Sequence, residues 1–258
     1  VDISTVTVAF VEDMIKNHKD NMDIDVELHQ KFQNEYDKRI SKYIETGEYD
    51  AIEWYESELF NYLSLGNIGT FDKHWQKCAV KVANEAKLHD IPWVLDPVGA
   101  GASEFRSNNA KELLFLKPTV LRGNGSEIIS ISGISNSGKG VDSTSSSNEA
   151  LDAAIKISND NDIIVAITGE VDYVTNGSKV YAIHGGNEMM TKITATGCAL
   201  TCLIGAALTS NQDNLVSTAN MLGIYSVASD KASKSAKGPA SLRTELIDTV
   251  YNLSLIHI

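Results

Sequence analysis

The chain has 258 residues, of which 43% are hydrophobic, which is enough apolar material for the core of one large α/β domain. A formal net charge of −12 argues against a general nucleic-acid-binding surface. There is no apolar run long enough to span a membrane, and no basic segment leads into an apolar one near residue 1, so we expect a cytoplasmic protein. The three cysteines (Cys78, Cys198 and Cys202) lack a disulfide-framework spacing and suit a reducing compartment.

The acidic charge is concentrated at the front of the chain. Residues 1–60 hold 15 Asp and Glu against 6 Lys and Arg, a balance of −9, which leaves −3 for residues 61–258. Between residues 26 and 45, apolar side chains recur at helical spacing within a polar background. A solvated acidic helix packed by its aromatic stripe accounts for this pattern better than an interaction arm does. Residues 1–64 are therefore predicted to form a segment distinct from the body of the chain.

From residue 63 onward, short apolar runs alternate with longer amphipathic ones. They predict strands over 63–70, 91–96, 119–121 and 163–167, and helices over 71–89, 110–115 and 151–158. We expect a hairpin over 171–175 and 179–184, turning at Asn176-Gly177, and helices over 197–209, 214–234 and 241–252. Alternating strands and helices indicate an α/β fold, with a mostly parallel sheet covered by helices on both faces.

Polar residues follow several predicted strands, which is where ligands bind in such sheets. Asp96 ends a strand and precedes the glycine-rich loop 97–103, where a carboxylate can organise Mg²⁺ or its waters beside phosphates. The alternative for Asp96 is an ordinary helix or turn cap. Thr168 and Gly169 follow another strand and offer a hydroxyl and a peptide group to a nucleotide, although this signal is weak by itself.

A cation and a carboxylate lie on either side of a predicted turn into a helix. Arg122 suits nucleotide phosphates, and Glu127, five residues later, suits an indirect magnesium role. As an isolated pair, the two side chains could instead form a surface ion pair, which is the commoner case.

The stretch 193–206 is a loop of small residues that runs into a long apolar helix. The first turn of a helix attracts phosphates, Gly197 would let the backbone approach a ligand, and the helix field would favour the thiolate of Cys198. The alternative is a plain buried helix capped by Thr196, and this stretch alone favours that alternative. Cys202, one turn deeper, is predicted to belong to the core.

Residues 133–140 nearly match the phosphate-binding pattern G-x-x-x-x-G-K-[ST] but fail it at two points. Gly140 stands where the Mg²⁺-binding Ser or Thr belongs, and the segment follows a predicted helix instead of a strand. The segment is therefore predicted to be a flexible surface loop.

Seven short motifs follow one another between residues 65 and 253. They are Asn67-Ile-Gly-Thr70, Asp96-Pro-Val-Gly-Ala-Gly-Ala102, Arg122-Gly-Asn-Gly-Ser-Glu127, Gly140-Val-Asp142, Thr168-Gly-Glu170, Ala195-Thr-Gly-Cys198 and Gly238-Pro-Ala-Ser-Leu242. In this order and at this spacing, the set resembles the hydroxyethylthiazole kinase family of the ribokinase-like superfamily. The residues around 123–127 and 139–142 resemble the fungal members most. The resemblance implies a ribokinase-like three-layer α/β/α fold for residues 65–253, with an atypical N-terminal part.

The resemblance also implies a reaction: ATP-dependent phosphorylation, with Mg²⁺, of the hydroxyl of 4-methyl-5-(2-hydroxyethyl)thiazole in thiamine salvage. Cys198 would take the hydroxyl proton, and the amides around Thr196 and Gly197 would stabilise the transferring phosphoryl group. The residues implied to contact the nucleotide are Arg122, Asn124, Thr168 and Gly169. Those implied to contact the substrate are Asn67, Gly69 and Ala195, and those implied to surround magnesium are Asp96 and Glu127. Family members are trimers with thiazole bound between subunits, so a homotrimer is implied.

The two ends of the chain depart from the family pattern. Residues 1–64 contain neither the His-x-Ile-Thr-Asn segment nor the Ser-Pro-x-Met strand end that contact the thiazole in the family. No barrel pattern of a fused thiamine-phosphate synthase is visible there either. Residues 254–258 are predicted to be a non-native tail, because the last six residues resemble a translated sequencing adapter. Two alternatives follow: another ribokinase-like kinase, for hydroxymethylpyrimidine or pyridoxal, or a nucleotide-binding relative without catalysis.

Overall fold

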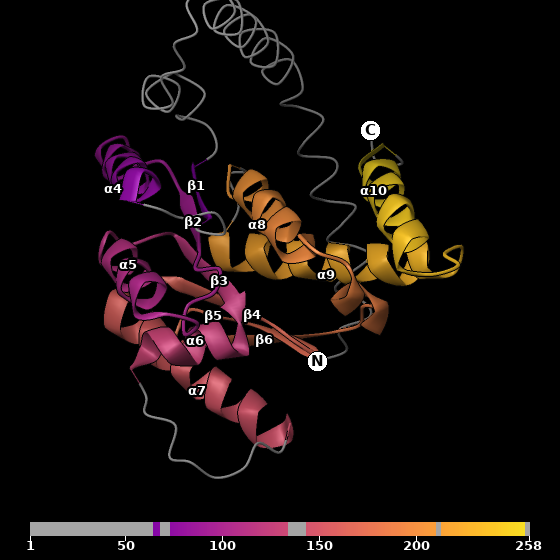
Figure 1. The fold of residues 1–258 in the computed structure, drawn as a ribbon, viewed down its shortest axis with the longest axis horizontal. Helices are drawn as coiled ribbons and strands as arrows, with labels where there is room; N and C mark the ends of the chain where they lie inside the picture. The colour runs from indigo at the N-terminus through magenta and orange to yellow at the C-terminus, as the bar shows by residue number, and fades with distance from the viewer. Residues whose placement is uncertain (1–63, 68–72, 134–142, 210–212, 256–258) are drawn as a thin grey trace, which may run out of the picture.

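The computed structural model describes residues 64–67, 73–133, 143–209 and 213–255 (Figure 1). Several predictions lie outside these ranges: the helix over 26–45, the substrate contact at Gly69, the loop after Gly133 and the end of the tail over 254–258. Within the described ranges, no helix combines the length and the apolar character that crossing a membrane requires.

A six-stranded sheet forms the centre of the described part, and its strands lie side by side in chain order. The strands are β1 (Ser64–Asn67), β2 (Trp93–Asp96), β3 (Val120–Asn124), β4 (Ile164–Thr168), β5 (Val171–Thr175) and β6 (Val180–His184). Strands β1 to β4 pair in parallel, and β5 and β6 add an antiparallel hairpin. The predicted mostly parallel sheet is confirmed. The hairpin is confirmed too, with Gly177 in its turn at a φ of +85°.

One face of the sheet is covered by the helices that connect the parallel strands. In the described ranges they are α4 (Lys73–Leu88), α5 (Glu104–Phe115), α6 (Gly125–Ser132) and α7 (Ser143–Asn161). Because the strands are added in one direction and such crossovers are right-handed, the connections pass over the same face. Their apolar sides share one core with Leu95, Leu121 and Val165 of the sheet.

The other face is covered by the C-terminal helices. These are α8 (Thr196–Ala207), α9 (Asn214–Ser233) and α10 (Pro239–Leu255), and the short 3₁₀ helix η2 (Glu188–Lys192) leads into α8. They pack on Val94, Val120 and Ala166, the chain neighbours of strand residues that point to the first face. Figure 1 shows α8 to α10 on one side of the sheet and α5 to α7 on the other, so the three-layer α/β/α prediction is confirmed.

Three predicted boundaries are wrong. Helix α5 begins at Glu104 instead of residue 110, because the Ser103 side chain accepts a hydrogen bond from the Arg106 amide and caps a helix whose first turns are polar. Helix α7 begins at Ser143 instead of residue 151, again through polar turns without apolar periodicity. Arg122 lies inside β3 and not in a turn, because pairing with β4 extends the strand to Asn124.

Candidate active site

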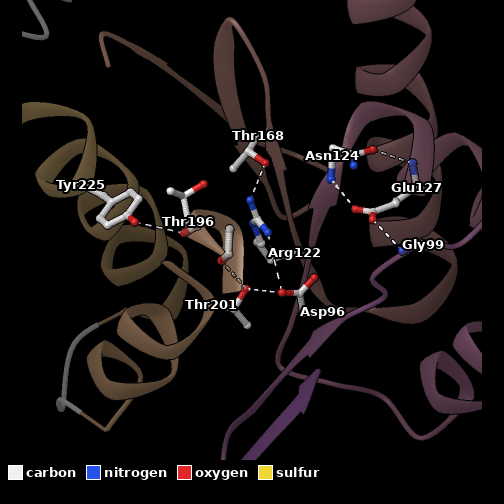
Figure 2. A network of polar contacts seen from close by, with 10 residues as sticks. Asp96, Gly99, Arg122, Asn124, Glu127, Thr168, Thr196, Thr201 and Tyr225 are labelled. Carbon is white, nitrogen blue, oxygen red and sulfur yellow. Dashed lines mark hydrogen bonds and ion pairs between the residues drawn. The ribbon is translucent and has the colours of Figure 1, made fainter. Parts of the chain in front are cut away.

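The carboxyl ends of the parallel strands meet at one edge of the sheet, as the sequence predicts. Asn67 lies opposite Asp96 in the β1–β2 register, and Asn124 lies opposite Thr168 in the β3–β4 register. The start of α8 lies at the same edge. Thr201 in its second turn contacts Asp96 of β2 (Figure 2), and Gly197 in its first turn lies against the guanidinium of Arg122 of β3. The structure thus brings together most of the predicted site residues.

Arg122 joins two of these strand ends. Its Nη2 donates a hydrogen bond of 2.6 Å to Thr168 Oγ1, and its Nη1 lies 3.7 Å from Asp96 Oδ2 (Figure 2). The side chains of Asp96 and Arg122 are both buried, so this ion pair is shielded from water, unlike the surface pair considered above. Arg122 Nε has no hydrogen-bond partner among the described residues, which leaves a buried donor beside the strand ends.

The position of the Arg122 guanidinium requires a glycine at position 197. A Cβ atom at position 197 would lie 2.6 Å from Arg122 Nη1 and 2.9 Å from Nη2, well inside van der Waals contact. The glycine therefore lets the guanidinium lie against the first turn of α8. The sequence indicated that Gly197 makes room for a ligand, and the structure fills this room with a cationic side chain that suits phosphates.

Helix α8 begins without a side-chain cap. Ala195 is the N-cap residue, in the left-handed region at a φ of +67°, and its methyl group makes no hydrogen bond to the helix. The alternative that Thr196 caps the helix is therefore wrong, since Thr196 is its first residue. A helix start without a side-chain cap keeps amide N–H groups and the positive dipole end for an anion.

The two cysteines of α8 differ from the prediction in one respect. Cys198 lies in the first turn of α8 and is half-buried, so the residue is partly open to solvent. Cys202 is exposed, and its assignment to the core is wrong. The helix turns Leu200, Thr201 and Ile204 inward, which places position 202 on the opposite side.

Tyr225 of α9 is a contact that sequence reasoning missed. Its hydroxyl donates a hydrogen bond of 3.1 Å to the backbone oxygen of Thr196 and holds the first residue of α8 (Figure 2). Burial raises the pKa of Tyr225 to about 12, against an opposing effect of the Arg122 charge, so the hydroxyl keeps its proton at neutral pH. Position 225 carries no sequence signal beyond its place in a predicted helix.

Asn124 and Glu127 form a capping box at the start of α6. Asn124 Oδ1 accepts from the Glu127 amide at 3.0 Å, and Glu127 Oε2 accepts from the Asn124 amide at 2.9 Å. Glu127 Oε1 also accepts from the Gly99 amide at 2.9 Å, so this buried carboxylate ties the glycine-rich loop to α6 (Figure 2). The predicted contact of Asn124 with the nucleotide and that of Glu127 with magnesium would form in addition to these hydrogen bonds.

The turn after β4 is held by Asp172, a second residue without a sequence signal. The Gly169 amide donates a hydrogen bond of 2.9 Å to Asp172 Oδ1, so this amide is already engaged at the predicted nucleotide contact. Burial raises the pKa of Asp172 from its ordinary value of 3.8 to about 6, while the Gly169 amide and the charge of Arg122 oppose the rise.

The carboxylate of Asp96 suits a magnesium ion that is also bound by phosphates. Within the described ranges, no group of three or more His, Cys, Asp or Glu side chains is assembled for a metal. Mg²⁺ usually takes one or two carboxylates together with substrate phosphates and waters, so buried Asp96 beside Arg122 fits this mode and an all-protein cage does not.

Comparisons with known proteins point to one family. The model of the "Hydroxyethylthiazole kinase family" matches residues 60–255. Hydroxyethylthiazole kinase of Leptospira borgpetersenii is 43% identical over 191 residues, which are 74% of this chain and 72% of that protein. Hydroxyethylthiazole kinase of Pyrococcus furiosus is 40% identical over 189 residues, or 73% of this chain and 71% of that protein.

The fold agrees with these matches. The solved structure of hydroxyethylthiazole kinase from Pyrococcus horikoshii superposes with a TM-score of 0.66 at 34% identity, covering 73% of this chain and 70% of that one. The ribokinase-like architecture expected from the sequence is therefore confirmed. The family model spans the strand ends and the start of α8 that form the site described above, and this chain belongs to the hydroxyethylthiazole kinase family.

Proposed function

We propose that this protein transfers the γ-phosphoryl group of ATP to the hydroxyl of 4-methyl-5-(2-hydroxyethyl)thiazole in thiamine salvage. The family membership supports the reaction type and the acceptor. One structural observation carries the assignment to this site: the start of α8, with Cys198 in its first turn, lies against an Arg122 guanidinium held between Asp96 and Thr168.

The nucleotide would bind along the strand ends. Arg122 supplies a fixed positive charge for phosphates, and Thr168, Gly169 and Asn124 flank it at the ends of β3 and β4. The amides of Thr196 and Gly197 at the helix start would stabilise the negative charge of the transferring phosphoryl group. Cation, amides and helix dipole all have the sign that this charge requires.

Cys198 is the proposed general base. As the oxygen of the alcohol forms its bond to the γ-phosphorus and the bond to the ADP oxygen breaks, the hydroxyl proton passes to the Cys198 sulfur. Its position in the first turn of α8 places Cys198 next to the amides proposed to stabilise the transferring phosphoryl group.

Asp96 and Glu127 would hold Mg²⁺ or its waters next to the phosphates, and a bound ion neutralises phosphate charge during transfer. Ala195, Asn67 and Gly69 are the proposed acceptor contacts, of which Ala195 and the backbone of Asn67 are described at the site edge. A homotrimer and a cytoplasmic location complete the proposal, supported by the resemblance and by the cysteine usage, respectively.

A coupled ATP assay tests the proposal. The purified full chain should phosphorylate the thiazole alcohol with a kcat/KM well above those for hydroxymethylpyrimidine and pyridoxal. A preference for another alcohol would overturn the substrate assignment, and ATP binding without turnover of any alcohol would indicate a non-catalytic relative.

Replacing the proposed base provides the sharpest variant. Cys198→Ala should lower kcat by about 100-fold or more and leave nucleotide affinity unchanged, since general bases typically contribute factors of that size. Cys202→Ala, an exposed thiol one turn away on the same helix, is the matched control and should keep the wild-type kcat. Equal rates for Cys198→Ala and the wild type would remove Cys198 from the mechanism.

A further inference from the structure

Thr201 is a buried polar residue of α8 that the proposed reaction does not use. It is 1% exposed and lies one helical turn after Gly197. Its Oγ1 lies 2.8 Å from Asp96 Oδ2 and 3.1 Å from the backbone oxygen of Gly197 (Figure 2). The side chain thus bridges two segments of the site that are 105 residues apart in the sequence.

A hydroxyl has one proton and can donate it to one acceptor at a time. Of the two acceptors, Asp96 Oδ2 is the nearer and carries the charge, and charge-assisted hydrogen bonds are the shorter and stronger kind. The Thr201 proton is therefore directed at the carboxylate, with the Gly197 carbonyl as the weaker partner.

Asp96 needs such a donor because its side chain is itself 1% exposed. Arg122 Nη1 faces the same oxygen from 3.7 Å, a distance that is attractive for charges but too long for a hydrogen bond. The short contact from Thr201 adds direction to this attraction, because a hydrogen bond restrains the rotation of the carboxylate group. The orientation of Asp96 is thereby linked to the position of α8.

Thr218 of α9 shows how a buried threonine behaves when it is only structural. It is 0% exposed, and its Oγ1 donates to the Asn214 carbonyl of its own helix at 2.7 Å. This bond to the fourth preceding residue is the common way to satisfy a helical threonine. Thr201 holds the equivalent bond at 3.1 Å and places its hydroxyl nearer to a carboxylate of another element.

We infer that Thr201 is a positioning residue, whose hydroxyl fixes the Asp96 carboxylate relative to the first turn of α8. The carboxylate proposed for magnesium and the turn that carries Cys198 then keep a constant separation. The role of the carboxylate rests on the proposed function, and the position of Thr201 rests on the contacts alone. The hydroxyl of Thr201 should therefore affect the magnesium dependence, which a packing role would not do.

The test compares Thr201→Val, which keeps the shape but removes the hydroxyl, with Thr201→Ser, which keeps the hydroxyl. Magnesium titrations of the binding of a non-hydrolysable ATP analogue, measured by calorimetry on the full chain, give a readout that is independent of turnover. Thr201→Val should raise the half-saturating Mg²⁺ concentration about tenfold or more and lower kcat by about tenfold to 100-fold, which is the usual effect of losing a partner of a metal-holding group. Thr201→Ser should stay within about threefold of the wild type in both quantities.

Two further variants make the result specific. Thr218→Val is the matched control and should leave the magnesium titration unchanged, whatever its cost in melting temperature. If Thr201→Val does not fold, Thr201→Ala removes the same hydroxyl without placing a methyl group against the carboxylate, and the same shift is expected. In an Asp96→Asn background, Thr201→Val should produce little additional shift, because the two residues act on one function.

A wild-type magnesium titration in the hydroxyl-free variants would overturn the inference, as would an impaired Thr201→Ser or an equal shift in Thr218→Val. The proposed function fails separately: a wild-type protein that binds magnesium and nucleotide but phosphorylates no thiazole alcohol contradicts the substrate, and the titration shift would still support the role of Thr201. Nucleotide binding that does not depend on magnesium in the wild type would contradict both.

Discussion

Arg122 and Gly197 fit each other at the level of single atoms. The guanidinium is buried, donates to Thr168, and lies where any side chain at position 197 would begin. A buried cation of this kind keeps its place only while its neighbours leave the room open, because it cannot lose its charge and the surrounding sheet is closely packed. A side chain at position 197 would therefore alter the site while leaving all of its polar and charged groups in place.

Gly197→Ala should therefore displace Arg122 and raise the KM for ATP by about tenfold, equivalent to about 1.4 kcal/mol of binding free energy, with a smaller effect on kcat. Steady-state kinetics at saturating thiazole alcohol measure both quantities. Gly223→Ala in α9 is the control, since a Cβ there meets nothing within 4 Å and alanine favours the helix. An unchanged KM for ATP in Gly197→Ala would show that Arg122 does not contact the nucleotide.

Asp172 gives the free energy of unfolding a defined dependence on pH. Its pKa is raised to about 6 in the folded protein, chiefly by burial, so the folded protein binds the proton more tightly than the unfolded chain does. Below about pH 4 both forms are protonated and no cost arises. Stability then falls as pH rises from about 4 to about 6, where the unfolded chain ionises first, and the cost remains above that range.

Asp172→Asn removes this cost while its side-chain oxygen can still accept from the Gly169 amide. At pH 7 the variant should be more stable than the wild type by about 1 to 2 kcal/mol, less than the full shift because water reaches part of the side chain. At pH 3.5 to 4 the difference should shrink towards zero. Urea unfolding at the two pH values measures it, with the exposed Asp152→Asn as control. An equal gain at both pH values would contradict the assignment to ionisation.

At the scale of the elements, Glu127 connects three backbone segments with one side chain. Its two oxygens accept from Gly99 in the loop after β2 and from Asn124 at the end of β3, while its own amide opens α6. The glycine-rich loop and the end of β3 are thus held at a fixed separation, and any phosphate that they contact meets an ordered backbone.

Glu127→Gln leaves one of these two amides facing an NH₂ group instead of an oxygen. The variant should lose about 1 to 3 kcal/mol of unfolding free energy, the usual cost of an unsatisfied buried donor. Urea unfolding measures the loss, with the exposed Glu149→Gln on α7 as the control. The magnesium dependence of the folded variant should also change, and an unchanged magnesium titration would count against a role of Glu127 near the ion.

At the scale of the whole molecule, the fold was largely predictable because most strands and helices carry clear hydrophobic periodicity. The helix starts at Glu104 and Ser143 were not, because polar first turns have no such pattern and depend on caps and packing. The strand-end residues Asp96, Arg122 and Thr168 could be singled out because polar side chains there interrupt an apolar run.

The residues that hold the site together could not be found in this way. Thr201, Tyr225 and Asp172 lie inside elements, where the sequence pattern distinguishes inside from outside but does not identify the partner across the fold. The same limit explains Cys202, since four-residue spacing from Cys198 gives a helix side but not which side faces the sheet. Only the packing of α8 on the sheet decides these contacts.

The alanine at the beginning of α8 has a consequence for how the protein behaves in the cell. Ala195 has no side-chain oxygen to cap the helix, so the protein without nucleotide keeps an excess of positive partial charge at the point where a phosphate is expected. The phosphates of a bound nucleotide would neutralise this charge, and part of the binding free energy would then appear as a higher melting temperature of the domain. The abundance of the folded enzyme would in this way follow the supply of its own phosphate donor.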